Sequence, residues 1–345
     1  MINGRVITPS VIDNLRRNDT CGKIQKTEKR REYTYNSNSM FMRYNRTAIT
    51  LGNFDGMHLG HMRLIEILTR RASELGAPAL VYTFDEHPRN VISGAGSVKL
   101  LTGGSKKREL LSETAIDYFY TERFDMKLAS LTPEAFVGDV LVKKFGVRLV
   151  VVGSDFRFGR GGCGDIGILK KLGAIYGFSV EEVRPVVSRI AKINEYGIIS
   201  SSSIRALIAT GQMEQAGAML GRLFSLKCWI SAYYKMTDFR YKTTAVHMYP
   251  DMRMAVPPPG VYITGACIEG VLCKGFAEVC AGIGSMKSVT AVINYFLDFD
   301  GDLHETEIEI FFYRKLSGDA GVDAGEKNSN RLERYAADTG RYFVS

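Results

Sequence analysis

Residues 51–61 have the sequence LGNFDGMHLGH, with an apolar run before them and an amphipathic pattern after them. The run over residues 47–51 is typical of a buried strand, and apolar side chains three or four apart over residues 62–75 are typical of a helix. Glycines at positions 52, 56 and 60 allow a tight turn and a close approach to a ligand. The pattern predicts a strand, a glycine turn and a helix whose first N–H groups suit a phosphate.

His58 and His61 are three residues apart in this turn. Imidazoles at a helix start can donate hydrogen bonds to a triphosphate and to charge that develops on a transferring phosphorus. A pair with this spacing also arises often by chance. A metal pair is disfavoured because no nearby Cys, His or Glu completes a ligand set, so no metal ligand from the protein is predicted.

The composition indicates an ordinary globular protein. The 345 residues are 45% hydrophobic and 24% charged, which favours two domains, and no apolar stretch approaches a transmembrane helix. The first 46 residues carry ten Lys/Arg and four Asp/Glu and lack the apolar core of a secretory signal, so we expect a cytoplasmic protein without a membrane partner. The six cysteines form no CxxC pair, which argues against a zinc site.

The net charge of +8 favours anionic partners. The basic residues are spread along the chain, apart from residues 23–31, and no zinc finger, RRM or basic-helix pattern is present. We therefore expect nucleotide substrates and no nucleic acid.

Residues 47–210 alternate strand and helix patterns. The expected strands are residues 47–51, 79–84, 148–152 and 179–186. The expected helices are residues 62–75, 106–113, 133–145, 166–176 and 202–210. This order predicts an α/β fold with a parallel sheet, and ligands bind such sheets beyond the carboxyl ends of the strands.

Three segments that carry chemistry follow expected strands, at residues 52–61, 85–88 and 153–160. The third segment would be either a flexible loop with a small hydrophobic staple or an aromatic surface that stacks on a planar ring, with Asp155 beside it. The serine run at residues 200–203 is a helix cap or, with Arg205, a phosphate grip.

These motifs resemble those of the bacterial riboflavin kinase/FAD synthetases, within the HxGH nucleotidyltransferase superfamily. Residues 51–61 are similar to the family's GxFDxxHxGH, residues 152–159 to GxDFxFG and residues 199–205 to ISS[ST]xIR. Residues 84–88 are similar to FxPHP with Glu86 in place of the first proline, and residues 101–107 to LTxxxxK. The resemblance covers residues 47–222 and ends at a junction where Leu223 replaces the usual proline.

The resemblance implies a Rossmann-like nucleotidyltransferase domain that makes FAD and pyrophosphate from FMN and ATP, with Mg²⁺ brought by the ATP phosphates. The catalytic residues would be His58, His61 and Arg205. The ATP-binding residues would be Gly52, Asn53, Phe54, Asp55, Gly60, Ser200, Ser201, Ser202 and Arg205. The flavin-binding residues would be Phe84, His87, Pro88, Asp155, Arg157 and Phe158.

From residue 223 the pattern changes to period two, over residues 260–264, 291–297 and 307–312, which predicts an antiparallel β-barrel. Residues 256–262 and 297–303 are similar to two segments of the family's riboflavin kinase module. The position of that module's catalytic base is Ile293, and Val246 stands where its asparagine holds the Mg-nucleotide. Another acid, such as Glu278 or Glu305, would serve as base if this alignment is shifted.

The predicted organisation is a basic extension (1–46), an FMN adenylyltransferase domain (47–222), a degenerate kinase-like barrel (223–316) and a polar tail (317–345). The predicted activity is FAD synthesis without effective riboflavin kinase activity. The alternatives are a fully bifunctional enzyme, another HxGH transferase, and a catalytically silent flavin- or nucleotide-binding protein. The oligomeric state is left open, a homo-oligomer included.

Overall fold

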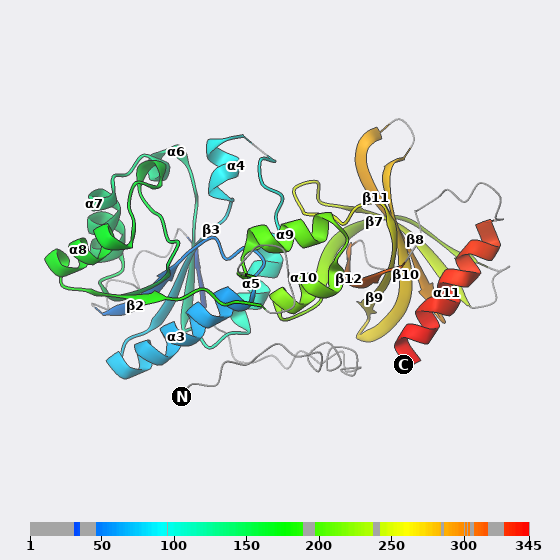
Figure 1. Cartoon of the computed structure of the whole chain (residues 1–345), viewed down its shortest axis with the longest axis horizontal. Helices are drawn as coiled ribbons and strands as arrows, with labels where there is room; N and C mark the ends of the chain where they lie inside the picture. The colour runs from blue at the N-terminus through cyan, green and yellow to red at the C-terminus, as the bar shows by residue number, and fades with distance from the viewer. Residues whose placement is uncertain are drawn as a thin grey trace. The chain divides into compact units, whose positions relative to one another are not determined.

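The computed structural model describes residues 31–34, 46–94, 96–188, 197–236, 242–283, 286–299, 301, 303, 307–316 and 328–344. The described chain divides into two compact units, the first ending at Val187 and the second beginning at Ser188 (Figure 1). Most of the predicted extension and part of the predicted tail lie outside the described residues.

A parallel sheet forms the first unit and confirms the predicted α/β class. Its six strands have the order β1-β4-β3-β2-β5-β6, and neighbouring strands pair in parallel. The strands are β1 (Arg31–Thr34), β2 (Thr47–Leu51), β3 (Ala79–Phe84), β4 (Tyr118–Glu122), β5 (Val147–Gly153) and β6 (Ser179–Val183). The strand before the histidine motif, β2, lies between β3 and β5, so the segments after all three strands leave the same edge of the sheet.

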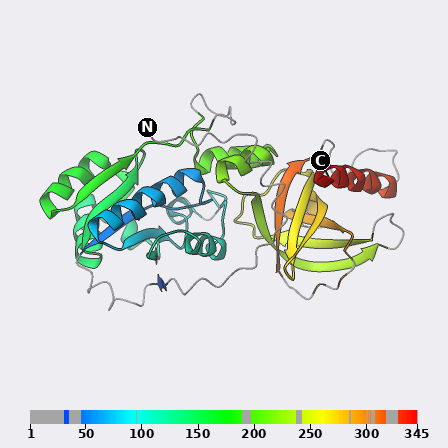
Figure 2. The same cartoon turned by 90° about the horizontal axis from the view of Figure 1, so that it is seen from below.

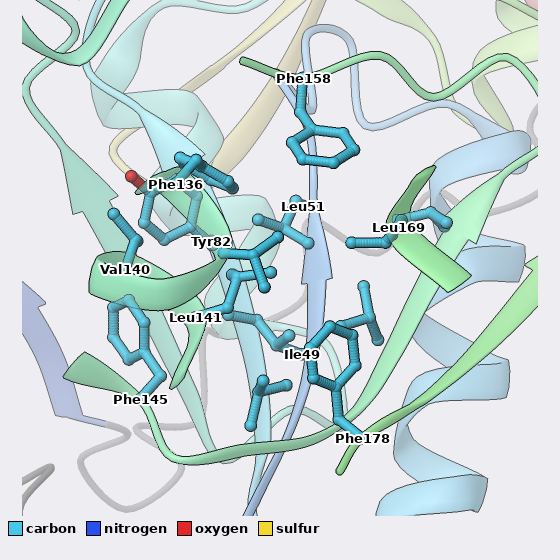
Figure 3. Packing of buried hydrophobic residues seen from close by; sticks show 14 of the residues in the cluster. Ile49, Leu51, Tyr82, Phe136, Val140, Leu141, Phe145, Phe158, Leu169 and Phe178 are labelled. Atoms are coloured by element: carbon cyan, nitrogen blue, oxygen red, sulfur yellow. The ribbon is translucent and has the colours of Figure 1, made fainter. Parts of the chain in front are cut away.

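Helices cover both faces of this sheet. They are α3 (Leu59–Leu75), α4 (Pro88–Ile92), α5 (Gly104–Ser112), α6 (Met126–Ala129), α7 (Pro133–Ala135), the π-helix η1 (Phe136–Lys144), the short η2 (Arg160–Gly162) and α8 (Ile166–Tyr176). On one face, Leu68 of α3 packs with Val81 and Val151. On the other face, η1 and α8 bury side chains against Ile49 and Tyr82 (Figure 3). Within the described ranges, no helix is long and apolar enough to cross a membrane.

Local signals explain where α3 begins and ends. The helix begins three residues before its predicted start because His58 caps it, with Nδ1 accepting the His61 N–H at 3.3 Å. It ends at Gly76, whose φ of 59° lies in the left-handed region that glycine adopts readily. The cap histidine is thus part of the helix start itself.

The second unit contains the predicted barrel. Six antiparallel strands close in the order β10-β11-β8-β7-β12-β9 (Figure 2). They are β7 (Phe224–Met236), β8 (Thr243–Pro250), β9 (Gly260–Ile268), β10 (Val271–Ile283), β11 (Met286–Leu297) and β12 (Glu307–Lys315). The barrel interior holds fully buried aromatic side chains such as Phe224, Phe296 and Phe312.

Three helices belong to the second unit: α9 (Ser201–Ala209), α10 (Met213–Leu220) and α11 (Asn328–Val344). The α10 helix contacts β7 and β12, so packing groups residues 201–220 with the barrel, whereas the sequence analysis assigned them to the nucleotidyltransferase domain. That functional assignment stays a prediction. The α11 helix packs Leu332 and Tyr335 with Phe276 of β10 and Tyr295 of β11.

Gly275 of β10 offers a test of barrel packing. A Cβ atom there would lie 2.1 Å from the Tyr295 carbonyl oxygen, whereas one at Gly340 of α11 would meet nothing within 4 Å. We expect Gly275→Ala to lower the barrel's free energy of unfolding by about 2–3 kcal/mol because of overpacking. Gly340→Ala should raise it by about 0.5–1 kcal/mol. Trp229 in β7 is the only tryptophan, so its fluorescence during urea unfolding reports on the barrel, and equal midpoints for both variants would contradict the packing.

Candidate active site

The β2–α3 turn, residues 52–58, has an unusual backbone. Phe54 (φ 48°) and Met57 (φ 40°) adopt left-handed conformations, as does Gly56 (φ 86°). Each such non-glycine residue costs about 1–3 kcal/mol of strain. Of the three glycines expected to permit the turn, only Gly56 has a positive φ, and Gly52 instead leaves room for the Phe54 ring, 3.3 Å from its would-be Cβ.

Asp55 holds this turn in place. Its buried carboxylate oxygen Oδ1 accepts the backbone N–H of Leu101 at 2.9 Å and that of Thr102 at 3.0 Å. The Gly56 N–H donates to the Thr102 hydroxyl at 3.0 Å. The Phe54 ring and the Met57 side chain are both buried in the core beneath the turn. The Asp55 carboxylate therefore binds the chain itself and shapes the turn.

The two histidines form a stacked pair at the start of α3. Their ring centroids are 3.7 Å apart at an interplanar angle of 17°, and the Phe54 ring lies 5.0 Å from that of His61. Because Nδ1 of His58 accepts a backbone N–H, a neutral His58 carries its proton on Nε2, where it can donate to a ligand. The first turn of this 17-residue helix has no acidic side chain, so the positive end of its dipole also favours an anion.

The β3–α4 loop, residues 85–87, meets this turn. The Nε2 atom of His87 lies 3.5 Å from the Asn53 side-chain amide, while its Nδ1 accepts the Arg89 N–H and caps α4. Asp85 accepts the N–H groups of Glu86 and Phe124. The half-buried Phe84 ring lies edge-on to that of Phe124, 5.1 Å away between centroids. The first two predicted loops are therefore in contact.

Lys107 of α5 is a residue to which the sequence analysis gave no role, although it noted the motif around it. Its Nζ donates to the carbonyl oxygens of Asn53 at 3.2 Å and Phe84 at 2.7 Å, and lies 3.4 Å from the Thr83 hydroxyl. Thr83 in turn donates to the Asn53 carbonyl. Burial lowers the pKa of Lys107, against the opposing effect of Asp55, Asp85 and Glu86.

The third predicted loop, residues 153–160, follows β5 and differs from expectation in its aromatic residues. Phe158 is only 7% exposed and packs in the core with Leu51 and Phe136 (Figure 3). Its backbone also forms an antiparallel bridge with Gly164, so the Phe158 ring is not part of an exposed aromatic surface, and its role at the flavin stays a prediction. Asp155 is exposed, and the largely exposed Arg157 lies 3.5 Å from the Asp165 carboxylate.

The serine run begins α9, in the other compact unit. Ser200 caps the helix by accepting the Ser203 N–H at 3.1 Å, which makes it the helix cap that the sequence analysis considered. Ser202 is exposed, and Ser201 and Arg205 are partly buried. That these residues bind the same ATP phosphates as the histidine pair stays a prediction.

In the barrel, the predicted base position lies beside an acid. Ile293 of β11 pairs directly with Glu278 of β10, so both side chains lie on the same face of the barrel wall. The Glu278 carboxylate is buried, with Oε1 3.2 Å from Arg331 of α11 and Oε2 3.3 Å from the Tyr295 hydroxyl. Burial, followed by the charge of Glu278, raises the pKa of Tyr295. Among the described residues, no group of three His, Cys, Asp or Glu could hold a metal ion.

Comparisons with known proteins identify relatives of this chain. A family model described as FAD synthetase matches residues 41–196. The bifunctional riboflavin kinase/FMN adenylyltransferase of Escherichia coli (strain K12) is 30% identical over 277 residues, which cover 78% of this chain and 84% of that protein. The protein of the same name from Listeria monocytogenes is 30% identical over 300 residues, covering 86% and 92%.

A solved structure shares the fold. The crystal structure of a macrolide-efflux protein from Streptococcus pneumoniae is 22% identical and covers 86% of this chain and 94% of its own, with a TM-score of 0.71. At this identity the likeness concerns the fold alone.

The role of Asp55 can be measured as stability. We expect Asp55→Ala to lower the free energy of unfolding of the sheet unit by about 2–3 kcal/mol, because it leaves the Leu101 and Thr102 N–H groups without their acceptor. Asp125→Ala, which removes an exposed cap of α6, should lower it by about 1 kcal/mol. Hydrogen exchange at Leu101 and Thr102 should speed up only in Asp55→Ala, and unchanged exchange there would contradict this role.

Proposed function

The chain belongs to the family of bifunctional riboflavin kinase/FMN adenylyltransferases, and from this premise we propose that it transfers AMP from ATP to FMN without effective riboflavin kinase activity. The observation that carries the first part is the stacked pair of His58 and His61 at the start of α3, on a turn that Asp55 holds in one conformation. Such a site supplies preorganised donors for a triphosphate.

In the proposed reaction a phosphate oxygen of FMN attacks the α-phosphorus of ATP. The new P–O bond forms while the bond to the β-phosphate oxygen breaks, and the electron pair leaves with pyrophosphate. The Nε2–H of His58, the His61 ring and the first amides of α3 would stabilise the negative charge that develops on the phosphorus oxygens. No side chain acts as a covalent nucleophile, so alignment and electrostatics supply the rate enhancement.

The remaining residues would bind the ends of the two substrates. Ser200, Ser201, Ser202 and Arg205 would hold the β- and γ-phosphates, and Gly52, Asn53 and Gly60 would line the nucleotide. Phe54 would contribute only its backbone there, because its ring is buried in the core. Phe84, His87, Pro88, Asp155 and Arg157 would border the flavin, whereas the buried Phe158 supports their loop. Mg²⁺ bound to the triphosphate would offset its charge, and Asp55 is an unsuitable ligand because its Oδ1 accepts backbone N–H groups.

The barrel keeps the scaffold of a kinase module and differs at its reactive positions. Ile293 cannot accept a proton, and the residues from 233 to 242 contain no glycine that would let a phosphate approach the backbone. Glu278 pairs directly with the base position, but Arg331 and Tyr295 bind its two oxygens. Glu305, the other acid considered, lies outside the described residues. Thr244 is fully buried and donates to the Phe299 carbonyl.

Supplying each flavin separately tests the proposal. With Mg-ATP and FMN the purified chain should form FAD and pyrophosphate, and with Mg-ATP and riboflavin it should form neither FMN nor FAD, as measured by flavin chromatography. FMN formed from riboflavin at a steady rate would overturn the second part. Glu278→Gln would then show whether Glu278 serves as the base. A chain that makes no FAD from FMN would favour a silent binding protein.

Loss of one histidine should affect the reaction far more than the fold. We expect His61→Ala to lower the rate of adenylyl transfer by about 10²-fold, because its ring acts on charge that develops in the transition state. His247→Ala, in the barrel strand β8, is a matched control and should leave the rate unchanged. Equal rates for His61→Ala and the parent protein would remove His61 from the mechanism.

A further inference from the structure

One cation joins the ends of two neighbouring strands. Lys107 Nζ binds the carbonyl of Asn53, at the head of the β2–α3 turn, and the carbonyl of Phe84, where β3 ends and the β3–α4 loop begins. The Thr83 hydroxyl provides a third oxygen, 3.4 Å away.

The charge on Lys107 matters for this contact. A protonated amine has three N–H groups for three oxygens, and a neutral one has two. The charged groups around the amine are Asp55 of the turn, Asp85 and Glu86 of the loop, and Arg108 of its own helix. The three carboxylates favour the protonated amine, whereas burial and Arg108 oppose it.

We propose that Lys107 is a positioning residue that fixes the spacing between the β2–α3 turn and the β3–α4 loop, and so aligns ATP with FMN. The inference rests on the proposed function, in which the turn binds ATP and the loop borders the flavin. Lys107 touches neither substrate in this scheme and acts through two backbone carbonyls. Its loss should therefore reduce alignment, measured by kcat, more than it reduces the binding of either substrate alone.

Lys107→Met keeps the aliphatic stem and removes the donors. In this variant we expect kcat at saturating ATP and FMN to fall about 10- to 100-fold, in line with a small misplacement of reacting groups. The Kd of ATP and that of FMN, each measured alone by calorimetry, should change less than about threefold. Lys107→Arg keeps a charged donor and should recover most of kcat. The matched control is Lys106→Met, because Lys106 pairs with Glu109 on the same helix. This variant should keep the kcat of the parent protein.

The pH dependence of kcat distinguishes a positioning role from a merely structural one, which would not change it. Wild-type kcat should fall at alkaline pH with a midpoint below the ordinary lysine value of 10.5, since burial lowers the pKa of Lys107. Lys107→Arg stays charged throughout and should lack this fall. If Lys107→Met fails to fold, this comparison decides: an identical alkaline fall in wild type and Lys107→Arg would overturn the proposal.

The outcomes separate this inference from the proposed function. If the wild type makes FAD and Lys107→Met has the same kcat, the positioning role is overturned while the proposed function stands. A loss confined to the Kd of one substrate would also overturn it, because Lys107 would then belong to a single binding site. A wild type that makes no FAD would overturn the proposed function and this inference with it.

Discussion

The carboxylate of Asp55 holds the β2–α3 turn in a conformation that bulky side chains disfavour. Left-handed Phe54 and Met57 cost about 1–3 kcal/mol each. Full burial of each of these side chains stabilises the fold by about 1.5–3 kcal/mol. Each charged hydrogen bond from Leu101 or Thr102 to Asp55 stabilises it by about 1.5–3 kcal/mol as well. These terms together outweigh the strain. The turn can therefore hold this conformation without a ligand, and the stacked histidines follow directly from it.

A single segment, residues 101–107, supports both loops of the candidate site. Its first two residues bind Asp55 through their amides, and Lys107, one turn into α5, binds the carbonyls at the ends of β2 and β3. The parallel sheet brings the strand ends to one edge, where His87 also contacts Asn53 directly. The hydrogen bonds from residues 101–107 add to that contact, so the geometry of the site also depends on residues with no expected contact to substrate.

The central architecture could be predicted from the sequence because its signals are local. The apolar strands β2 and β3 and the helix α8 follow directly from periodicity and caps, with α8 matching its predicted bounds. The strand β4 was missed, because a short strand has no distinct periodicity. The helix expected over residues 133–145 forms as α7 and η1, but the sequence did not indicate that η1 is π-helical. Left-handed Phe54 and buried Phe158 could not be predicted either, since tertiary packing determines both. Motifs located the site, and only the fold could reveal which side chains support it.

In the proposed function, the barrel keeps its fold while its reactive positions differ from those of a kinase module. Strand pairing needs only backbone groups and an apolar interior, and the sequence retains both across β7 to β12. Ile293 is partly buried and packs against the apolar cluster beside α11, and its neighbour Glu278 is stabilised by Arg331 and Tyr295. A buried carboxylate that has both partners costs far less than one left unpaired. The contacts of Glu278 with α11 and β11 therefore stabilise its carboxylate inside the barrel wall.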